Sequence, residues 1–237
     1  MELKDKIAVV TGGSRGIGKA TCKSLIQQGC KVIFCGKDRK NLEKAEKELK
    51  KYGDIKGYVA DLSKISEIKK FSDKIKNLDI LVNNAGVAYY KDFSKSSREE
   101  INQTIDVNIR ALILLTKHLL PKIKPNGIII NISSGAGKSG FSGLAVYCAS
   151  KFAVIGFTES LAQELENIKV ISVCPGGVDT EMYAGMSNHV PNLKPEHIAS
   201  KVVEICTEPA KFKSGSAVEV YKASDALEYL RMKYFRK

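Results

Sequence analysis

The sequence predicts an α/β protein in which one doubly wound parallel sheet of seven strands is flanked by helices. Short apolar segments alternate with segments of helical spacing along the chain, which is the order of βαβ units. The apolar segments read as continuous hydrophobic runs, as strands buried on both faces do. No linker, repeat or block of charge divides the 237 residues, so we expect a single domain over residues 1–237.

Seven short apolar runs are the expected strands. Most are rich in Val and Ile, which favour strands. In chain order they are Lys6–Val10, Val32–Cys35, Lys56–Ala60, Asp79–Val82, Gly127–Ile132, Lys169–Val173 and Ala217–Tyr221.

The segments between these runs space their apolar residues as helices do. The expected helices are Gly16–Gln28, Arg39–Tyr52, Ile65–Asn77, a long region from about Arg98 to Lys122, and Tyr147–Glu166. Residues 179–194 mix Gly, Met and polar residues, and we expect them to form a mobile lid over the substrate. The basic tail, residues 223–237, has helical spacing and is expected to dock on the domain rather than on a membrane surface.

Charge and composition exclude several classes of protein. The net charge is +12, but the lysines interleave with acids, as in Asn41–Glu48, which favours a solvated helix surface over a nucleic-acid interface. No apolar run approaches the ~20 residues of a membrane span, and the N-terminus lacks the apolar core of a signal peptide. The six cysteines and three histidines show no metal-ligand spacing, so we expect reduced thiols, no metal and a cytoplasmic protein.

A glycine-rich loop, Thr11–Gly18, joins the first expected strand to the first expected helix. Glycine lets the backbone turn sharply and lie close to a ligand. The N-terminus of the following helix offers unpaired N–H groups and a positive dipole end to phosphate. The loop therefore predicts a site for a dinucleotide pyrophosphate, with an ordinary tight turn as the alternative.

Tyr147 and Lys151 lie four residues apart on an expected helix, so their side chains share one face. A free tyrosine ionises near pH 10. A neighbouring ammonium, together with a positive nicotinamide ring, should lower that pKa and let the phenol exchange a proton with a substrate oxygen. Taken alone, such a pair is more often an ordinary feature of a helix surface.

Five motifs in order give this pair its context. They are T-G-x-x-x-G-I-G at residues 11–18, N-N-A-G at 83–86, Asn108, Ser134 thirteen residues before Tyr147, and P-G-x-V-x-T at 175–180. In this order the chain resembles the short-chain dehydrogenase/reductase family over nearly its whole length. The resemblance implies a Rossmann-type fold, 3-oxoacyl-carrier-protein reductases and carbonyl reductases as related members, and a homodimer or homotetramer.

The resemblance also assigns roles to residues. Ser134 would polarise the substrate oxygen, Tyr147 would exchange its proton, Lys151 would hold the ribose and tune Tyr147, and Asn108 would anchor a water. Asp61 would contact the adenine, with helix capping as the alternative. The expected cofactor-binding residues are Gly12, Ser14, Arg15, Gly16, Ile17, Gly18, Lys37, Asp61, Leu62, Asn84, Ala85, Gly86, Tyr147, Lys151, Pro175, Gly176, Val178 and Thr180.

The end of the second expected strand indicates which dinucleotide is bound. Enzymes that use NAD usually place a carboxylate there, whereas those that use NADP offer cations to the 2′-phosphate. Here Gly36 stands at that position, followed by Lys37, and Arg15 lies in the glycine loop. Asp38 is read as the cap of the next helix. We therefore expect NADP(H) to be preferred over NAD(H).

The expected function is NADP(H)-dependent interconversion of a carbonyl and an alcohol on a small or medium-sized, partly apolar substrate. The expected substrate loops are residues 135–143, the segment after Gly86 and residues 179–194. Their aromatic and Met residues suggest that apolar character, with packing of the lid as the alternative. Two alternatives remain: a 3-oxoacyl-[acyl-carrier-protein] reductase, and a catalytically silent NADP-binding regulatory protein. The expected partner is a small molecule, with no nucleic acid and no integral membrane segment.

Overall fold

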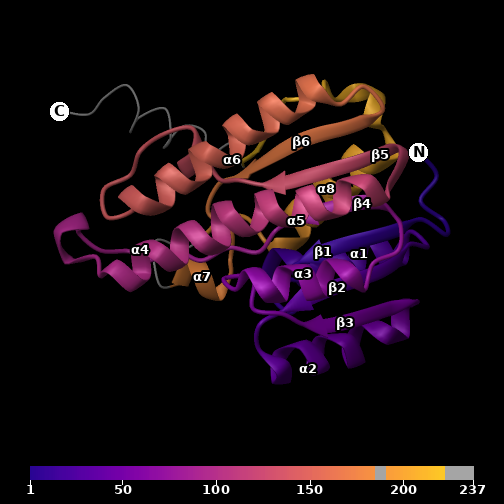
Figure 1. Cartoon of the computed structure of the whole chain (residues 1–237), viewed down its shortest axis with the longest axis horizontal. Helices are drawn as coiled ribbons and strands as arrows, with labels where there is room; N and C mark the ends of the chain where they lie inside the picture. The colour runs from indigo at the N-terminus through magenta and orange to yellow at the C-terminus, as the bar shows by residue number, and fades with distance from the viewer. Residues whose placement is uncertain (185–190, 222–237) are drawn as a thin grey trace.

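A seven-stranded parallel sheet forms the centre of the protein (Figure 1). The computed structural model describes residues 1–184 and 191–221. The strands follow the order β3-β2-β1-β4-β5-β6-β7. Strands β1 to β3 extend the sheet toward one edge and β4 to β7 toward the other, so the strand order reverses between β1 and β4. Their bounds are β1 Ile7–Thr11, β2 Lys31–Gly36, β3 Ile55–Val59, β4 Leu78–Asn83, β5 Ile123–Ile132, β6 Ile168–Pro175 and β7 Ala217–Val220. The predicted fold class is confirmed.

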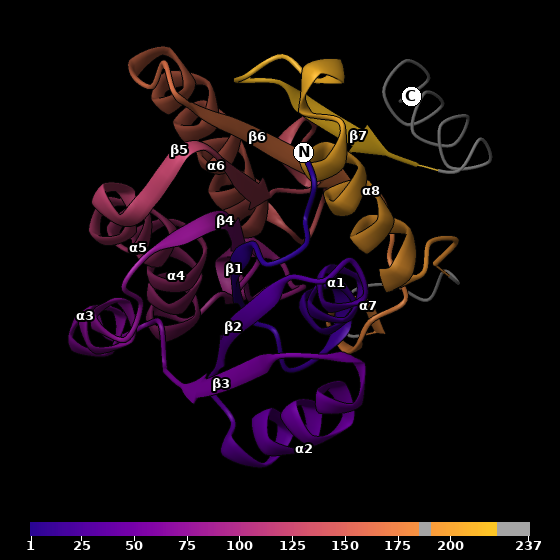
Figure 2. The same cartoon turned by 90° about the vertical axis from the view of Figure 1, so that its right-hand side faces the viewer.

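Helices cover both faces of the sheet, as Figure 2 shows end-on. One face carries α1 (Gly16–Gln27), α2 (Arg39–Leu49) and α8 (Pro195–Thr207). The other carries α3 (Ile65–Asp73), α4 (Arg98–Ile105), α5 (Ala111–Leu119) and α6 (Ala145–Glu164). A one-turn helix, α7 (Glu181–Ala184), follows β6.

The core explains why the strands are apolar throughout. Successive side chains of a strand point to opposite faces. In β1, Ala8 and Val10 pack under α1 and α2, while Val9 packs under α3 and α5. Both faces are buried by helices, so neither alternate position can be polar without a partner.

Two local predictions are borne out. The Asp38 carboxylate accepts a hydrogen bond from the Asn41 backbone N–H at 2.7 Å, so Asp38 caps α2. All six cysteines are unpaired and buried.

Other expectations need correction. Helix α8 was not expected from the sequence, and residues 181–184 of the expected lid loop form α7. The long helix expected from Arg98 to Lys122 is broken by a π-helical turn, Asp106–Arg110. Strand β5 begins at Ile123, earlier than expected, because Ile123 pairs with Leu78 before an irregularity in the register. The remainder of the expected lid up to residue 190, and the tail at 223–237, lie outside the described residues.

Candidate active site

A cleft with a volume of about 1500 Å³ opens at the carboxyl ends of β1, β4, β5 and β6. In open α/β sheets this edge, where the strand order reverses, is the usual place for a ligand. Apart from Asn108, every residue expected to bind the cofactor or catalyse lines this cleft. These residues are Gly12, Ser14, Arg15, Gly16, Ile17, Gly18, Lys37, Asp61, Leu62, Asn84, Ala85, Gly86, Ser134, Tyr147, Lys151, Pro175, Gly176, Val178 and Thr180.

The glycine-rich loop is shaped by contacts that only glycine permits. Gly12 has φ +65°, and a Cβ there would lie 3.0 Å from the Ala85 Cα. A Cβ on Gly18 would lie 2.2 Å from the Gly12 carbonyl oxygen, so any side chain would force α1 away from the loop. The loop therefore presents a bare backbone at the N-terminus of α1, as phosphate binding requires.

Hydrogen bonds connect the glycine loop to the loop after β4. The Thr11 hydroxyl accepts from the backbone N–H groups of Asn84 and Ala85, each at 2.9 Å. The Asn84 side-chain amide donates to the Thr11 carbonyl at 2.8 Å. These bonds hold the glycine loop and the loop after β4 together at the point where the strand order reverses.

Lys37 and Asp61 meet at the rim of the cleft. Their charged atoms lie 3.2 Å apart. Burial acts to raise the pKa of Asp61, but hydrogen bonds from Ser63 and Lys37 outweigh it, and the pKa is lowered. Asp61 accepts from both the backbone N–H and the hydroxyl of Ser63, whereas the N-cap of α3 is Lys64. The alternative in which Asp61 caps this helix is therefore excluded.

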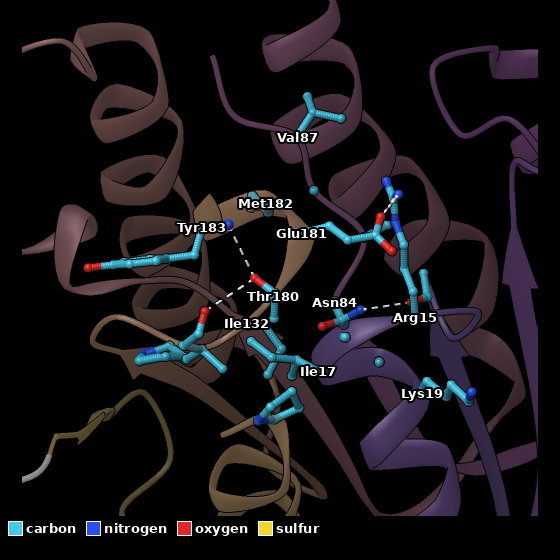
Figure 3. Close-up of a pocket in the computed structure, with 18 of the residues that line it drawn as sticks. Arg15, Ile17, Lys19, Asn84, Val87, Ile132, Thr180, Glu181, Met182 and Tyr183 are labelled. Carbon is cyan, nitrogen blue, oxygen red and sulfur yellow. Dashed lines mark hydrogen bonds and ion pairs between the residues drawn. The ribbon is translucent and has the colours of Figure 1, made fainter. Parts of the chain in front are cut away.

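Arg15 forms an ion pair with Glu181 of α7, with the two charged atoms 2.5 Å apart (Figure 3). Both side chains are exposed, at 65% and 74%. Beside them, the Thr180 hydroxyl donates to the Val178 carbonyl and accepts from the Tyr183 backbone N–H, each at 3.3 Å. The segment after β6 thus touches the glycine loop directly.

Ser134, Tyr147 and Lys151 come together from β5 and α6. Tyr147 and Lys151 are only 8% and 5% exposed, and both reach the cleft. The Ser134 hydroxyl accepts from the Ala136 backbone N–H at 3.1 Å and hydrogen bonds with the Tyr147 phenol. The Lys151 ammonium donates to the Ile132 carbonyl at 2.9 Å and lies 5.6 Å from the centre of the Tyr147 ring.

The pKa of Tyr147 in the protein by itself is raised, whereas the expectation of a lowered pKa includes a positive nicotinamide ring beside the phenol. Burial raises the pKa of Tyr147 to about 12, and the hydrogen bond with Ser134 opposes that rise without cancelling it. Burial also lowers the pKa of Lys151 to about 8. Burial disfavours the charged form of both side chains. In the protein by itself, desolvation of the Tyr147 phenol therefore outweighs the attraction to Lys151 that was expected to lower the pKa of Tyr147.

Asn108 supports the site from behind. It is buried in the π-helical turn, and its side chain exchanges hydrogen bonds with the backbone of Val87 at 2.8 and 2.9 Å. Its amide also donates to the Ser150 hydroxyl at 3.0 Å. Asn108 therefore fastens the loop after Gly86 to α6. The water expected at this residue stays a prediction.

Several residues of the cleft were missed from the sequence. Ile132 supplies the carbonyl that holds Lys151, and Gln103 on α4 lines the cleft. The neighbour of Ser134, Ser133, donates its hydroxyl to the Lys151 carbonyl and braces α6 instead. Gln103 follows another amide, Asn102, along the chain, and only the fold shows that Gln103 and not Asn102 faces the cleft.

Within residues 1–184 and 191–221, no group of three His, Cys, Asp or Glu side chains could hold a metal ion. Over the same residues, no helix has the length and apolarity that crossing a bilayer requires.

Comparisons with known proteins agree with this geometry. The family model for short chain dehydrogenases matches residues 6–191. A 3-oxoacyl-[acyl-carrier-protein] reductase of Aquifex aeolicus is 35% identical, covering 93% of this chain and 97% of its own. A 3alpha-hydroxysteroid dehydrogenase of Mediterraneibacter gnavus is 34% identical with the same coverage. A short chain dehydrogenase of Burkholderia cenocepacia, solved with NADP, superposes with a TM-score of 0.87 at 27% identity, covering 93% of this chain and 98% of that one.

Proposed function

The chain belongs to the short-chain dehydrogenase/reductase family, and from this premise we propose that it is an NADP(H)-dependent carbonyl/alcohol oxidoreductase. The proposed substrate is small or medium-sized and partly apolar. The observation that carries this proposal is that Ser134, Tyr147 and Lys151 share one cleft with the glycine loop.

The residues present fit a nicotinamide dinucleotide. The cradle formed by Gly12 and Gly18 would be filled by any Cβ, so it is shaped for close approach of a ligand to the backbone. The glycine loop would hold the pyrophosphate, and Lys151 the ribose. The backbone at Val178 and the Thr180 side chain would hold the carboxamide. When bound, the nicotinamide supplies or accepts a hydride.

Tyr147 is the proposed acid and base. With a pKa of about 12, its phenol carries its proton at neutral pH and can donate it from Oη to a carbonyl oxygen. Ser134 is placed to donate a hydrogen bond to the same oxygen and stabilise the developing alkoxide. In the oxidative direction Tyr147 must first lose its proton, which nearby positive charge favours.

Lys151 would supply part of that charge. Its ammonium is fixed by the Ile132 carbonyl, and with a pKa of about 8 it is largely protonated at neutral pH. The burial of both side chains excludes water from the proton transfer.

The preference for NADP(H) rests on the rim of the cleft. Gly36 carries no carboxylate, and a Cβ there would lie 2.9 Å from the Ser14 hydroxyl oxygen. Ser14, Arg15 and Lys37 thus offer one hydroxyl and two cations to a 2′-phosphate. The carboxylates of Glu181 and Asp61 already pair with these cations, so a phosphate would have to share or displace them.

Lys37→Asp tests this preference. Removing a hydrogen bond to a charged group should weaken NADPH binding about 10-fold while changing NADH binding less than about twofold. The control Lys40→Asp makes the same charge change at an exposed α2 residue outside the cleft and should alter neither. Fluorescence titration measures both constants, and equal weakening of the two cofactors would refute the assignment.

A 3-oxoacyl-[acyl-carrier-protein] reductase is the second candidate, because the Aquifex aeolicus relative of that name spans nearly the full chain. A carrier protein is acidic and needs free cations. The lysines just before and within the start of β5 are engaged elsewhere, since Lys122 donates to the Ser72 carbonyl at 2.7 Å and Lys124 lies 3.4 Å from Asp79. We therefore place this candidate second.

A homodimer or homotetramer remains part of the proposal. Phe152 on α6 and Ile113 on α5 are exposed apolar side chains on the same side of the sheet, and they would be covered in such an assembly. Light scattering of the purified protein measures its mass.

The function is tested by oxidation of NADPH, followed by absorbance, with ketones, diketones, sugars and acyl thioesters. Turnover of a carbonyl compound supports the proposal. Preferential turnover of acyl thioesters would favour the second candidate, a 3-oxoacyl-[acyl-carrier-protein] reductase. In Tyr147→Phe, turnover should fall about 10³-fold while NADPH still binds. NADPH binding without turnover of any compound by the unaltered protein would instead favour a regulatory protein.

A further inference from the structure

The substrate side of the cleft contains an amide whose role the reaction does not explain. Gln103 lies on α4 and lines the cleft together with Tyr147 and Ser134. Apolar residues, among them Val87 and Val107, line the same cleft. Polar groups of this kind, few in number and set among apolar ones, usually fix the orientation of a ligand.

Tyr89 fixes the orientation of this amide. Its hydroxyl donates to Gln103 Oε1 at 2.6 Å. Tyr89 does not line the cleft but lines a small separate cavity beside α4. The carbonyl end of the Gln103 amide is therefore occupied by a group outside the cleft.

The amide nitrogen is left for a ligand. Among the residues that the structure describes, Gln103 Nε2 has no hydrogen-bond partner. A substrate that fills the cleft would remove water from this donor, and an amide donor without an acceptor in an apolar surrounding is costly. A substrate oxygen at this position would satisfy it.

We propose that Gln103 determines specificity by donating a hydrogen bond from Nε2 to a second oxygen of the substrate, apart from the reacting carbonyl. The preferred substrates are then ketones with a further acceptor, such as keto esters, diketones or hydroxy ketones, or the matching alcohols. This inference rests on the proposed function and adds the substrate class to it.

The test compares two ketones of equal size with NADPH: ethyl acetoacetate, which has a second acceptor, and 2-octanone, which has none. Each variant is compared with the unaltered protein on the same ketone, so differences in intrinsic reactivity cancel. Gln103→Leu should raise KM for the keto ester about 5-fold with little change in kcat, because the bond forms in both ground and transition states. The constants for 2-octanone should stay within about twofold of the unaltered protein.

A second variant tests whether the orientation of the Gln103 amide matters, and a third serves as a control. Tyr89→Phe leaves the amide but removes its anchor, so KM for the keto ester should rise about 2-fold. The control Asn102→Leu makes the same change of side-chain type at an exposed neighbour outside the cleft and should change neither ketone. NADPH binding and melting temperature should be retained in all three variants.

The possible failures are distinguishable. If Gln103→Leu changes both ketones equally, or neither, the specificity role is overturned while the proposed function stands. If the unaltered protein reduces no carbonyl compound of the panel, the proposed function fails and this inference fails with it.

Discussion

The two halves of the cleft are built differently. The half proposed to hold the cofactor consists of the glycine loop and the loop after β4, where Thr11, Asn84 and Ala85 are joined by hydrogen bonds and Gly18 has no room for a Cβ. The half proposed to hold the substrate consists of loops with large side chains at the surface, among them Tyr90, which is 54% exposed. The first half is held by close backbone packing and by hydrogen bonds of the Thr11 and Asn84 side chains, whereas the second is lined by exposed side chains.

This difference predicts where the protein tolerates change. A site held by the backbone at the ends of buried strands cannot yield without moving the sheet. Exposed side chains can move at small cost, so the substrate half can vary while the cofactor half stays constant. Changes of similar size should therefore have unequal effects in the two halves.

Gly18→Ala should have the largest effect. Its Cβ would lie 2.2 Å from the Gly12 carbonyl oxygen, and overpacking of this kind costs about 3 kcal/mol. NADPH binding should weaken at least about 10-fold. The control Gly156→Ala, on α6 with no atom within 4 Å of its Cβ, should lose nothing. Urea unfolding and NADPH titration measure both effects, and equal behaviour of the two variants would contradict the account of the cradle.

Lys151 stands between the two halves, and its burial should appear in the pH dependence of stability. Its pKa is about 8 in the folded chain, against the ordinary value of 10.5 for an exposed lysine. Between these values the unfolded chain binds more protons, so the contribution of Lys151 to the free energy of unfolding rises with pH. Below pH 8 the cost of burying the charge is fully present.

The measured quantity is the free energy of unfolding of the unaltered protein minus that of Lys151→Met. This difference should increase by about 2 kcal/mol from about pH 7.5 to about pH 10. Taking the difference removes the opposite trend of the buried cysteines, whose pKa values are raised by burial. The exposed Lys117→Met is the control, and a flat difference for both variants would show that Lys151 is not desolvated.

Gly143→Ala perturbs the substrate half and should have a smaller effect. Gly143 has φ +77°, and a Cβ would lie 2.7 Å from the Tyr90 ring, which is exposed and can move. We expect a cost of about 1 kcal/mol from the backbone and a change of about twofold in KM for ketones, with NADPH binding unchanged. Gly140→Ala, with no atom within 4 Å of its Cβ, is the control. A loss of NADPH binding would show that the two halves are not independent.

The Arg15–Glu181 pair joins the halves and should give the smallest effect. Exposed ion pairs contribute under about 1 kcal/mol. Glu181→Gln should free Arg15 and tighten NADPH binding about twofold, with NADH binding unchanged. The gain should vanish when Arg15→Gln is also present. Its persistence in the double variant would mean that Glu181 acts on the cofactor by another route.

Motifs made of residues close together in the sequence allowed the strands and most of the residues of the cleft to be predicted. The glycine loop and the Tyr147–Lys151 pair each lie within one strand-to-helix unit, so spacing along the chain fixes their geometry. The alternation of apolar runs and helices predicted the seven strands for the same reason. Helix α8 was missed because it follows the expected lid, whose irregular composition masked the capping signal at Pro195.

Pairings between distant segments could not be predicted. Lys37 with Asp61, Arg15 with Glu181, and Tyr89 with Gln103 each join different loops or helices. The desolvation that raises the pKa of Tyr147 in the protein by itself could not be predicted either, since it comes from residues packed around α6. Such effects depend on how loops lie over the sheet, which no local pattern records.

The sequence alone therefore determined the family, the parallel sheet and the residues that meet at its carboxyl edge, because hydrophobic periodicity and short-range backbone geometry are properties of adjacent residues. The tertiary structure decided which charges are paired, which hydroxyl and ammonium are desolvated, and which amide faces the substrate. Those properties arise from the solvent that folding removes and from neighbours that folding brings together.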